Sequence, residues 1–146
     1  MDRDEIMSLL KTYFQSNAEK YNIDMAFLYG SWASGHPKKE SDVDIAVVFT
    51  EEMKDDKVFE IITSISLELT DILKKEVNTL FIDNDLSRPM IYYNAIVHGI
   101  PVYFRDFTRY SDIRMLAIHR MEDFSIFGLK WQEDIVRRRM EALNRG

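Results

Sequence analysis

Two carboxylates with the spacing of a metal site, Asp42 and Asp44, lie within the segment Ser41-Asp42-Val43-Asp44. An apolar run follows them, and alternation along a strand would place both side chains on one face. Two negative charges held this close repel each other unless something positive lies between them. Mg²⁺ suits such a position because it binds one or two carboxylates and completes its shell with water and substrate phosphates. The pair therefore predicts a divalent-cation site at the start of a strand.

A second motif, Gly30-Ser31, ends the preceding apolar run and opens a short helix that we predict over residues 31–34. Free backbone N–H groups at such a turn, together with the Ser31 hydroxyl, bind phosphate well. Each motif alone is ordinary, since Asp-x-Asp is commonly a solvated loop end and Gly-Ser a simple turn. Their combination would match by chance on the order of once in several hundred chains of this size. A phosphate-binding turn beside a carboxylate pair is what transfer from a nucleoside triphosphate requires.

The periodicity of apolar residues predicts the elements that position these motifs. Strands are expected where short apolar runs lack a helical period, and helices where the apolar spacing is three to four residues. The expected strands are 23–29, 43–49, 76–82 and 101–104, and the expected helices are 2–21, 55–75, 87–98 and about 107–143, the last in one or two segments. This alternation predicts the α/β (α+β) class, with a small mixed sheet of about four strands flanked by helices.

Length and composition limit the kind of protein. The 146 residues, 46% of them apolar, fit a single domain spanning 1–146, in which residues 107–146 form a helical tail. The absence of cysteine excludes a disulfide scaffold and a thiol nucleophile. No apolar run approaches the roughly 20 residues of a membrane span, and the acidic N-terminus does not resemble a signal peptide. We therefore expect a soluble, cytoplasmic protein with no membrane contact.

The distribution of charge argues against nucleic acid as a partner. Residues 1–104 carry 10 Lys and Arg against 18 Asp and Glu, whereas residues 105–146 carry 9 against 7. A nucleic-acid-binding protein normally has a basic face or a basic excess. No direct nucleic-acid binding is expected, and the arginine run at 137–139 is interpreted as a solvated helix face.

The sequence resembles the minimal nucleotidyltransferases (MNT) of the polymerase-beta-like superfamily. Gly30-Ser31, followed after ten residues by Asp42-Val43-Asp44, matches the signature of that family, and the segments after the second strand match more loosely. The resemblance implies the polymerase-beta-like fold and a nucleotidyl transfer. It implies that Asp42 and Asp44 are catalytic and hold Mg²⁺, that Gly30 and Ser31 bind the nucleotide, and that ATP is the substrate.

One position departs from the family pattern. A third carboxylate is usual on the strand expected at 76–82, yet Asn78 occupies that place. Asparagine can offer an oxygen to a cation but cannot accept a proton from the acceptor. Glu76 shares the strand face at a distance of about 7 Å and could substitute, whereas Asp83 would point to the opposite face of a regular strand.

Three functions remain open from the sequence. The resemblance favours the antitoxin of a type VII-like toxin–antitoxin system, which transfers AMP to a tyrosine of a helical HEPN ribonuclease toxin. The alternatives are a small-molecule nucleotidyltransferase of the aminoglycoside-modifying kind and a weakened, nucleotide-binding antitoxin that acts by binding alone. The oligomeric state, homo- or hetero-, is also open.

Two further regions invite a functional interpretation. His36, Lys38 and Lys39 lie in the loop above the expected site, where a solvated loop is the default and a contact with the triphosphate the alternative. Apolar residues of the tail are interpreted as core or as a partner-binding surface. They include Met115, Leu116, Ile118, Phe124, Ile126, Phe127 and Trp131.

Overall fold

The computed structural model describes residues 1–37 and 41–145, which form nine helices and strands. In chain order these are α1 (Arg3–Asn17), β1 (Ile23–Tyr29), α2 (Ser31–Ser34), β2 (Val43–Phe49), α3 (Asp55–Leu73), β3 (Val77–Phe81), α4 (Pro89–Ile96), β4 (Ile100–Phe104) and α5 (Phe107–Arg145).

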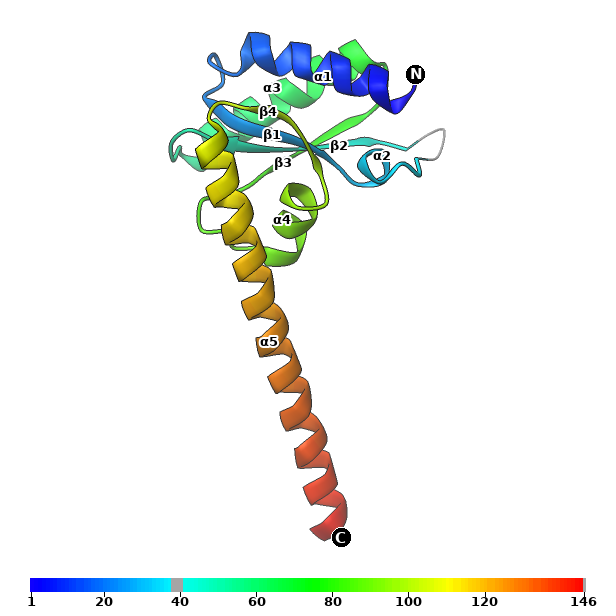
Figure 1. The fold of residues 1–146 in the computed structure, drawn as a ribbon, viewed down its shortest axis with the longest axis vertical. Coiled ribbons are helices and arrows are strands. Elements are labelled where there is room, and N and C mark those ends of the chain that lie inside the picture. The colour runs from blue at the N-terminus through cyan, green and yellow to red at the C-terminus, as the bar shows by residue number, and fades with distance from the viewer. Residues whose placement is uncertain (38–40, 146) are drawn as a thin grey trace.

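The strands form one mixed sheet in the order β3-β2-β1-β4. Strand β1 is antiparallel to both β2 and β4, whereas β2 and β3 are parallel. Helices α1 and α3 cover one face, and α4 with the first part of α5 covers the other (Figure 1). The predicted four-stranded mixed sheet flanked by helices is thereby confirmed.

Strand β2 shows why the sheet is buried on both faces. Its odd-numbered residues pack under α1 and α3, while Ala46 and Val48 pack under α4. A strand covered on both sides carries a nearly continuous apolar run rather than an alternating one. The even-numbered position Asp44 therefore belongs to the α4 face of the sheet.

The α1–α3 layer is held by apolar packing and by one polar network. The hydroxyl groups of Tyr13 and Tyr21 both donate hydrogen bonds to the Glu68 carboxylate, the second at 2.6 Å. Burial alone would raise the pKa of Glu68, but these two hydrogen bonds outweigh it and lower that pKa below the usual value. The ionised carboxylate thus links α1 and the turn after it to α3.

Several element boundaries differ from the expectation by a few residues, for local reasons. The first helix ends at Asn17 rather than 21, because a turn leads to Asn22, which has a positive φ of 55°. The third helix likewise ends at Leu73, before Lys74 with a φ of 55°. Helix α4 begins at Pro89, a residue suited to the first helical position because it has no N–H group to leave unpaired.

The C-terminal segment is one continuous helix, the simpler of the two expected forms. Its first turns are anchored by Arg109, whose Nε and Nη2 donate to the buried Asp24 carboxylate at 3.1 and 2.8 Å. Ala117 is buried against the α4 layer, and beyond it α5 projects away from the sheet (Figure 1). Within residues 1–37 and 41–145, no helix combines the length and apolarity needed to cross a membrane.

Candidate functional site

The two motif carboxylates lie where three strands meet at one end of the sheet. Asp44 is the second residue of β2, and Asp42 directly precedes that strand. In the sheet register, Asp44 lies between Tyr29, the last residue of β1, and Asn78 of β3. Tyr29 and the β3 residue Leu80 pack in the α4 layer, so alternation places Asn78 on the same face as Asp44.

The Asn78 side chain interacts with both acids. Its Nδ2 donates to Asp42 Oδ2 at 3.2 Å. The pKa of Asp44 is raised, chiefly by burial and further by the negative charge of Asp42, although a hydrogen bond with Asn78 opposes the rise. An amide thus partly compensates for two repelling carboxylates, in a position where a cation would do so fully.

Gly30 forms a turn that packs directly against Asp44. Its backbone has φ 76° and ψ −151°, a combination that is essentially restricted to glycine. A Cβ atom at Gly30 would collide with Asp44 Oδ2. The lack of a side chain therefore brings the backbone at the start of α2 up against the carboxylate pair.

The short helix α2 follows this turn, as the sequence predicted. Ser31 opens it, and Gly35 ends it in the left-handed conformation with φ 81°. The buried Trp32 side chain donates from Nε1 to the Ser41 carbonyl at 3.1 Å. This bond ties the phosphate-binding candidate Ser31 to the segment that carries Asp42.

Glu76 does not complete a metal-binding group of three acids with Asp42 and Asp44. The Glu76 carbonyl accepts the Val43 N–H at 2.9 Å, which extends the β2–β3 pairing, but its side chain is exposed. Among the described residues, no three His, Cys, Asp or Glu side chains are grouped closely enough to hold a metal. Asn78, rather than Glu76, is the neighbour of both aspartates.

The remaining loop and strand-end candidates lie apart from the pair. Asp83, expected on the opposite face of a regular strand, lies beyond the end of β3 and accepts hydrogen bonds from Ser87 and from the buried Tyr92 of α4. It therefore holds the turn into α4. His36 is exposed, and Lys38 and Lys39 lie outside the described residues.

Two site neighbours were not identified from the sequence. Burial and the nearby charge of Asp44 raise the pKa of Tyr29, whereas the positive charge of Arg88 lowers it. The Arg88 guanidinium carbon also lies 5.5 Å from the centroid of the Tyr92 ring. The sheet register and the start of α4 bring these residues near the carboxylates, and no motif in the sequence could have indicated that.

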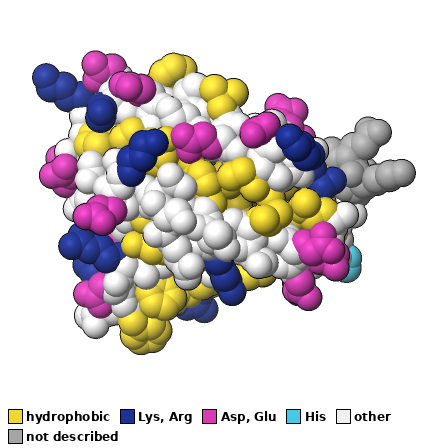
Figure 2. All heavy atoms as spheres, turned by 90° about the horizontal axis from the view of Figure 1, so that it is seen from above, with side chains coloured by type: hydrophobic (Ala, Val, Ile, Leu, Met, Phe, Trp, Pro, Cys, Tyr) yellow, Lys and Arg dark blue, Asp and Glu magenta, His cyan; other side chains and the backbone are white. Residues whose placement is uncertain are grey.

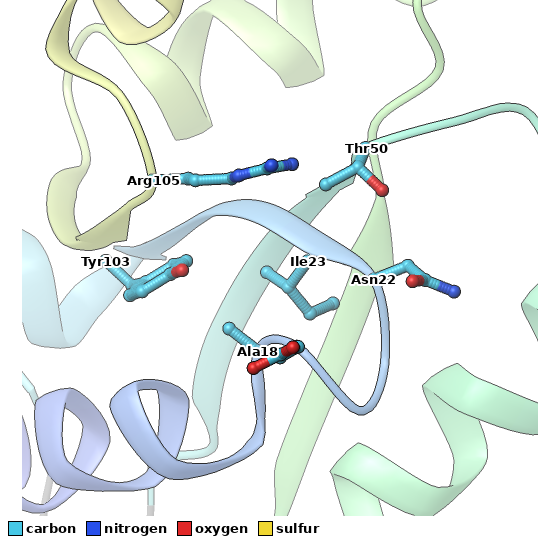
Figure 3. A pocket seen from close by; sticks show the side chains of 7 residues that line it. Ala18, Asn22, Ile23, Thr50, Tyr103 and Arg105 are labelled. Atoms are coloured by element: carbon cyan, nitrogen blue, oxygen red, sulfur yellow. The ribbon is translucent and has the colours of Figure 1, made fainter.

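A cavity of about 360 Å³ lies at the other end of the strands (Figure 3). It is lined by residues at the start of β1, after β2 and around the end of β4, namely Ile23, Thr50, Tyr103 and Arg105. Asp44, by contrast, is at the start of β2 and opposite the end of β1. The cavity is therefore separate from the candidate site.

The site residues suit a magnesium ion. Two carboxylates on one face, one of them with a raised pKa because of burial and its neighbour's charge, provide the oxygen ligands that Mg²⁺ prefers. Mg²⁺ needs only one or two protein carboxylates when substrate phosphates supply other ligands. The pair therefore fits such an ion together with a phosphate ligand, without a third acid.

Comparison with known proteins shows the family. The model of the polymerase beta nucleotidyltransferase family matches residues 9–108, more than half of the chain. The chain belongs to this nucleotidyltransferase family. No curated protein matches it.

Solved structures share the fold at low sequence identity. A chain of a toxin–antitoxin crystal structure with AMP-PNP superposes with a TM-score of 0.67 at 13% identity, covering 86% of this chain and 98% of that one. A chain from the complex of a tri-AMPylated Shewanella oneidensis HEPN toxin with an MNT antitoxin gives 0.64 at 12%, covering 89% and 98%. These likenesses establish the polymerase-beta-like fold.

The first prediction concerns the Gly30 turn. Gly30→Ala should destabilise the protein by about 1–3 kcal/mol because of backbone strain, and should displace the Asp44 carboxylate. Gly128→Ala is the matched control, because a Cβ there meets open space within α5. It should instead stabilise the protein by about 0.5–1 kcal/mol. Denaturant unfolding of both variants measures this, and an equal effect of the two would contradict the assigned contact.

The second prediction concerns the charge on Asp44. Because its pKa is raised above 3.8 in the folded state, its ionised form destabilises the fold at neutral pH. Asp44→Asn should raise the melting temperature by a few degrees at pH 7, and the gain should vanish as the pH falls through the raised pKa toward 3.8. Asp123→Asn, at an exposed position of α5, is the control and should leave the melting temperature unchanged at pH 7 and at lower pH. Thermal unfolding across pH measures this, and a destabilised Asp44→Asn at pH 7 would contradict it.

Proposed function

We propose that the protein is a Mg²⁺-dependent adenylyltransferase, the antitoxin of a toxin–antitoxin pair, which transfers AMP from ATP to a tyrosine of a HEPN ribonuclease toxin. The observation that carries this proposal is the aspartate pair packed against the Gly30 turn in a member of the nucleotidyltransferase family. The structural neighbours solved with AMP-PNP and with an AMPylated HEPN toxin support the choice of nucleotide and acceptor. We infer that the antitoxin and the toxin both act in the cytoplasm, where ATP and RNA are present.

The proposed roles of the residues follow from their positions. Asp42 and Asp44 would hold Mg²⁺, which supplies charge neutralisation and polarises the α-phosphate when bound. Ser31 and the backbone at the Gly30 turn would bind the terminal phosphates. The tyrosine oxygen then attacks the α-phosphorus. The bond between the α-phosphorus and the oxygen that bridges it to the β-phosphate breaks, and pyrophosphate leaves. The tyrosine proton passes to solvent or to a nearby base.

Accessibility favours a protein as the acceptor. Asp42 and Asn78 are exposed, and Asp44 is only half-buried. The carboxylate pair therefore lies at an open surface that another protein can approach, so that the acceptor protein supplies part of the site. Figure 2 views the opposite side of the molecule, above α1 and α3 in Figure 1, where acidic and basic side chains are interspersed with hydrophobic ones.

The third prediction tests the transfer itself. The toxin, incubated with this protein, ATP and Mg²⁺, should gain the mass of one or more AMP groups by intact-mass spectrometry. Asp44→Asn should abolish the gain, because both metal ligation and charge neutralisation depend on that carboxylate, whereas Asp123→Asn should leave it unchanged. An equal mass gain with Asp44→Asn would contradict the proposed site.

A second candidate function, inhibition by binding alone, is favoured by one observation. Asn78 occupies the register position beside Asp44 where the family usually has a carboxylate, and an amide cannot accept a proton. On this alternative, the toxin would be inhibited by a stable complex without covalent change, and Asp44→Asn would inhibit it as well as the wild type does.

The fourth prediction tests the role of Asn78. Asn78→Asp should raise the rate of AMP transfer by tenfold or more, because general base catalysis contributes about 10²–10⁴-fold. Asn84→Asp introduces the same chemistry at an exposed position before α4 and should have no effect. Single-turnover assays measure both rates. Unchanged transfer in Asn78→Asp would mean that proton removal does not limit this site.

A further inference from the structure

The distal part of α5, residues 121–144, exposes apolar side chains that nothing in the described chain covers. In Figure 1 this part of the helix extends well beyond the sheet and the other helices. Eight large apolar residues along it are between 45% and 80% exposed: Phe124, Ile126, Phe127, Leu129, Trp131, Val136, Met140 and Leu143. Contiguous apolar surface of this kind marks an interaction site rather than ordinary solvated helix.

Seven of these eight residues, together with Met121 and Ile135, fall into two stripes, and Phe127 lies outside both. The first stripe, Met121, Phe124, Trp131 and Ile135, continues the face on which Tyr110, Ile113 and Ala117 pack against the α4 layer. The second stripe consists of Ile126, Leu129, Val136, Met140 and Leu143. Its positions are alternately three and four residues apart, and Glu133 occupies the position between Leu129 and Val136. At 3.6 residues per turn, the two stripes are centred about 130° apart. The remaining side of the helix carries Asp123, Lys130, Asp134 and Glu141, with Phe127 at its border with the first stripe.

This arrangement favours a partner that contributes two helices. A single helix packed against α5 covers one seam and leaves the other exposed. A helix with two apolar stripes about 130° apart fits into the groove between two neighbouring helices, so that each stripe packs on one of them. The polar side with Asp123 and Lys130 would then remain in water.

A second copy of this chain fits the surface less well. In a parallel pair of identical second stripes, Glu133 would face its own copy and place two like charges in the seam. A symmetric pair would also bury only one stripe of each chain. A different protein can cover both stripes and can offer a basic residue to Glu133.

The size of the surface is close to that of a standard interface. Twenty-four residues of helix extend about 36 Å, and two sides about 10 Å wide amount to roughly 700 Å². A standard interface buries about 800 Å² on each partner. Docking of this segment alone would therefore approach the area of a specific protein–protein contact.

The position of α5 also favours the acceptor protein as the occupant. Helix α5 packs on the α4 face of the sheet, and the side chains of Asp44 and Asn78 belong to the same face. A protein held along α5 is consequently held on the side of the sheet on which the candidate site opens.

We propose that residues 121–144 of α5 form a docking helix that the helical toxin clasps between two of its own helices. This inference rests on the proposed function for the identity of the partner. The docking helix would then raise the local concentration of the acceptor tyrosine at the carboxylate pair.

The test compares two apolar double variants with a polar one on the same turns. Phe124→Ala with Trp131→Ala removes the first stripe, and Leu129→Ala with Val136→Ala removes the second. Asp123→Ala with Lys130→Ala is the control, since it leaves the net charge unchanged. Binding of the full-length chain to a nuclease-inactive toxin is measured by calorimetric titration, with circular dichroism as a check that the helix is retained.

Each apolar variant should raise the Kd about 30-fold or more, as expected for loss of interface hot spots, whereas the control should leave it unchanged. An effect confined to one stripe would overturn the two-helix clasp. Unchanged Kd values in both apolar variants would overturn the docking helix altogether. If the wild-type protein forms a dimer in the absence of toxin and both apolar variants are monomeric, the partner of the docking helix is a second copy of this chain and not the toxin.

AMP transfer, measured in the same samples, separates this inference from the proposed function. Toxin that binds through both stripes but gains no AMP would preserve the docking helix and refute the enzymatic role. Toxin that gains AMP equally with all variants at subsaturating concentration would preserve the enzyme and refute the docking helix. Asp44→Asn should bind the toxin as tightly as the wild type does.

Discussion

The close approach of the Gly30 backbone to the Asp44 carboxylate is the constraint on which the candidate site depends. The antiparallel pairing of β1 and β2 sets Tyr29 opposite Asp44, so the turn after β1 must cross directly over that carboxylate. A Cβ at this position would collide with Asp44 Oδ2, and Gly30 makes the crossing with a φ of 76°. One contact thereby fixes the relative positions of the turn and the carboxylates for which we propose phosphate and metal binding.

The same geometry has an electrostatic cost in the protein alone. Burial and Asp42 both raise the pKa of Asp44, and the Asn78 amide relieves only part of that unfavourable charge. Removal of the charge should increase stability, but the proposed metal ligation requires it. A bound cation would reverse the sign of this effect, so the charges that destabilise the protein alone would favour binding of a metal–nucleotide complex.

The sequence predicted best the features governed by local patterning. The ranges of β1, α2 and β2 match the expectation residue for residue, because buried strands and a glycine turn leave a strong local signal. The place of Asn78 near the aspartates was expected only from the family resemblance, and the β2–β3 register sets it beside Asp44. The role of Asp83 in the turn before α4 and the proximity of Arg88 to the site could not be predicted, since they depend on how α4 packs on the sheet. The proximity of Tyr29 depends on the β1–β2 register, which the sequence does not specify.

The most direct test of the account is whether a divalent cation binds at the aspartate pair together with a triphosphate. Mn²⁺ titrated into the protein with an ATP analogue that has a methylene bridge between the α- and β-phosphates can be followed by electron paramagnetic resonance. The account predicts nucleotide-dependent Mn²⁺ binding that Asp44→Asn abolishes and Asp123→Asn preserves. Equal Mn²⁺ binding by wild type and Asp44→Asn would contradict it.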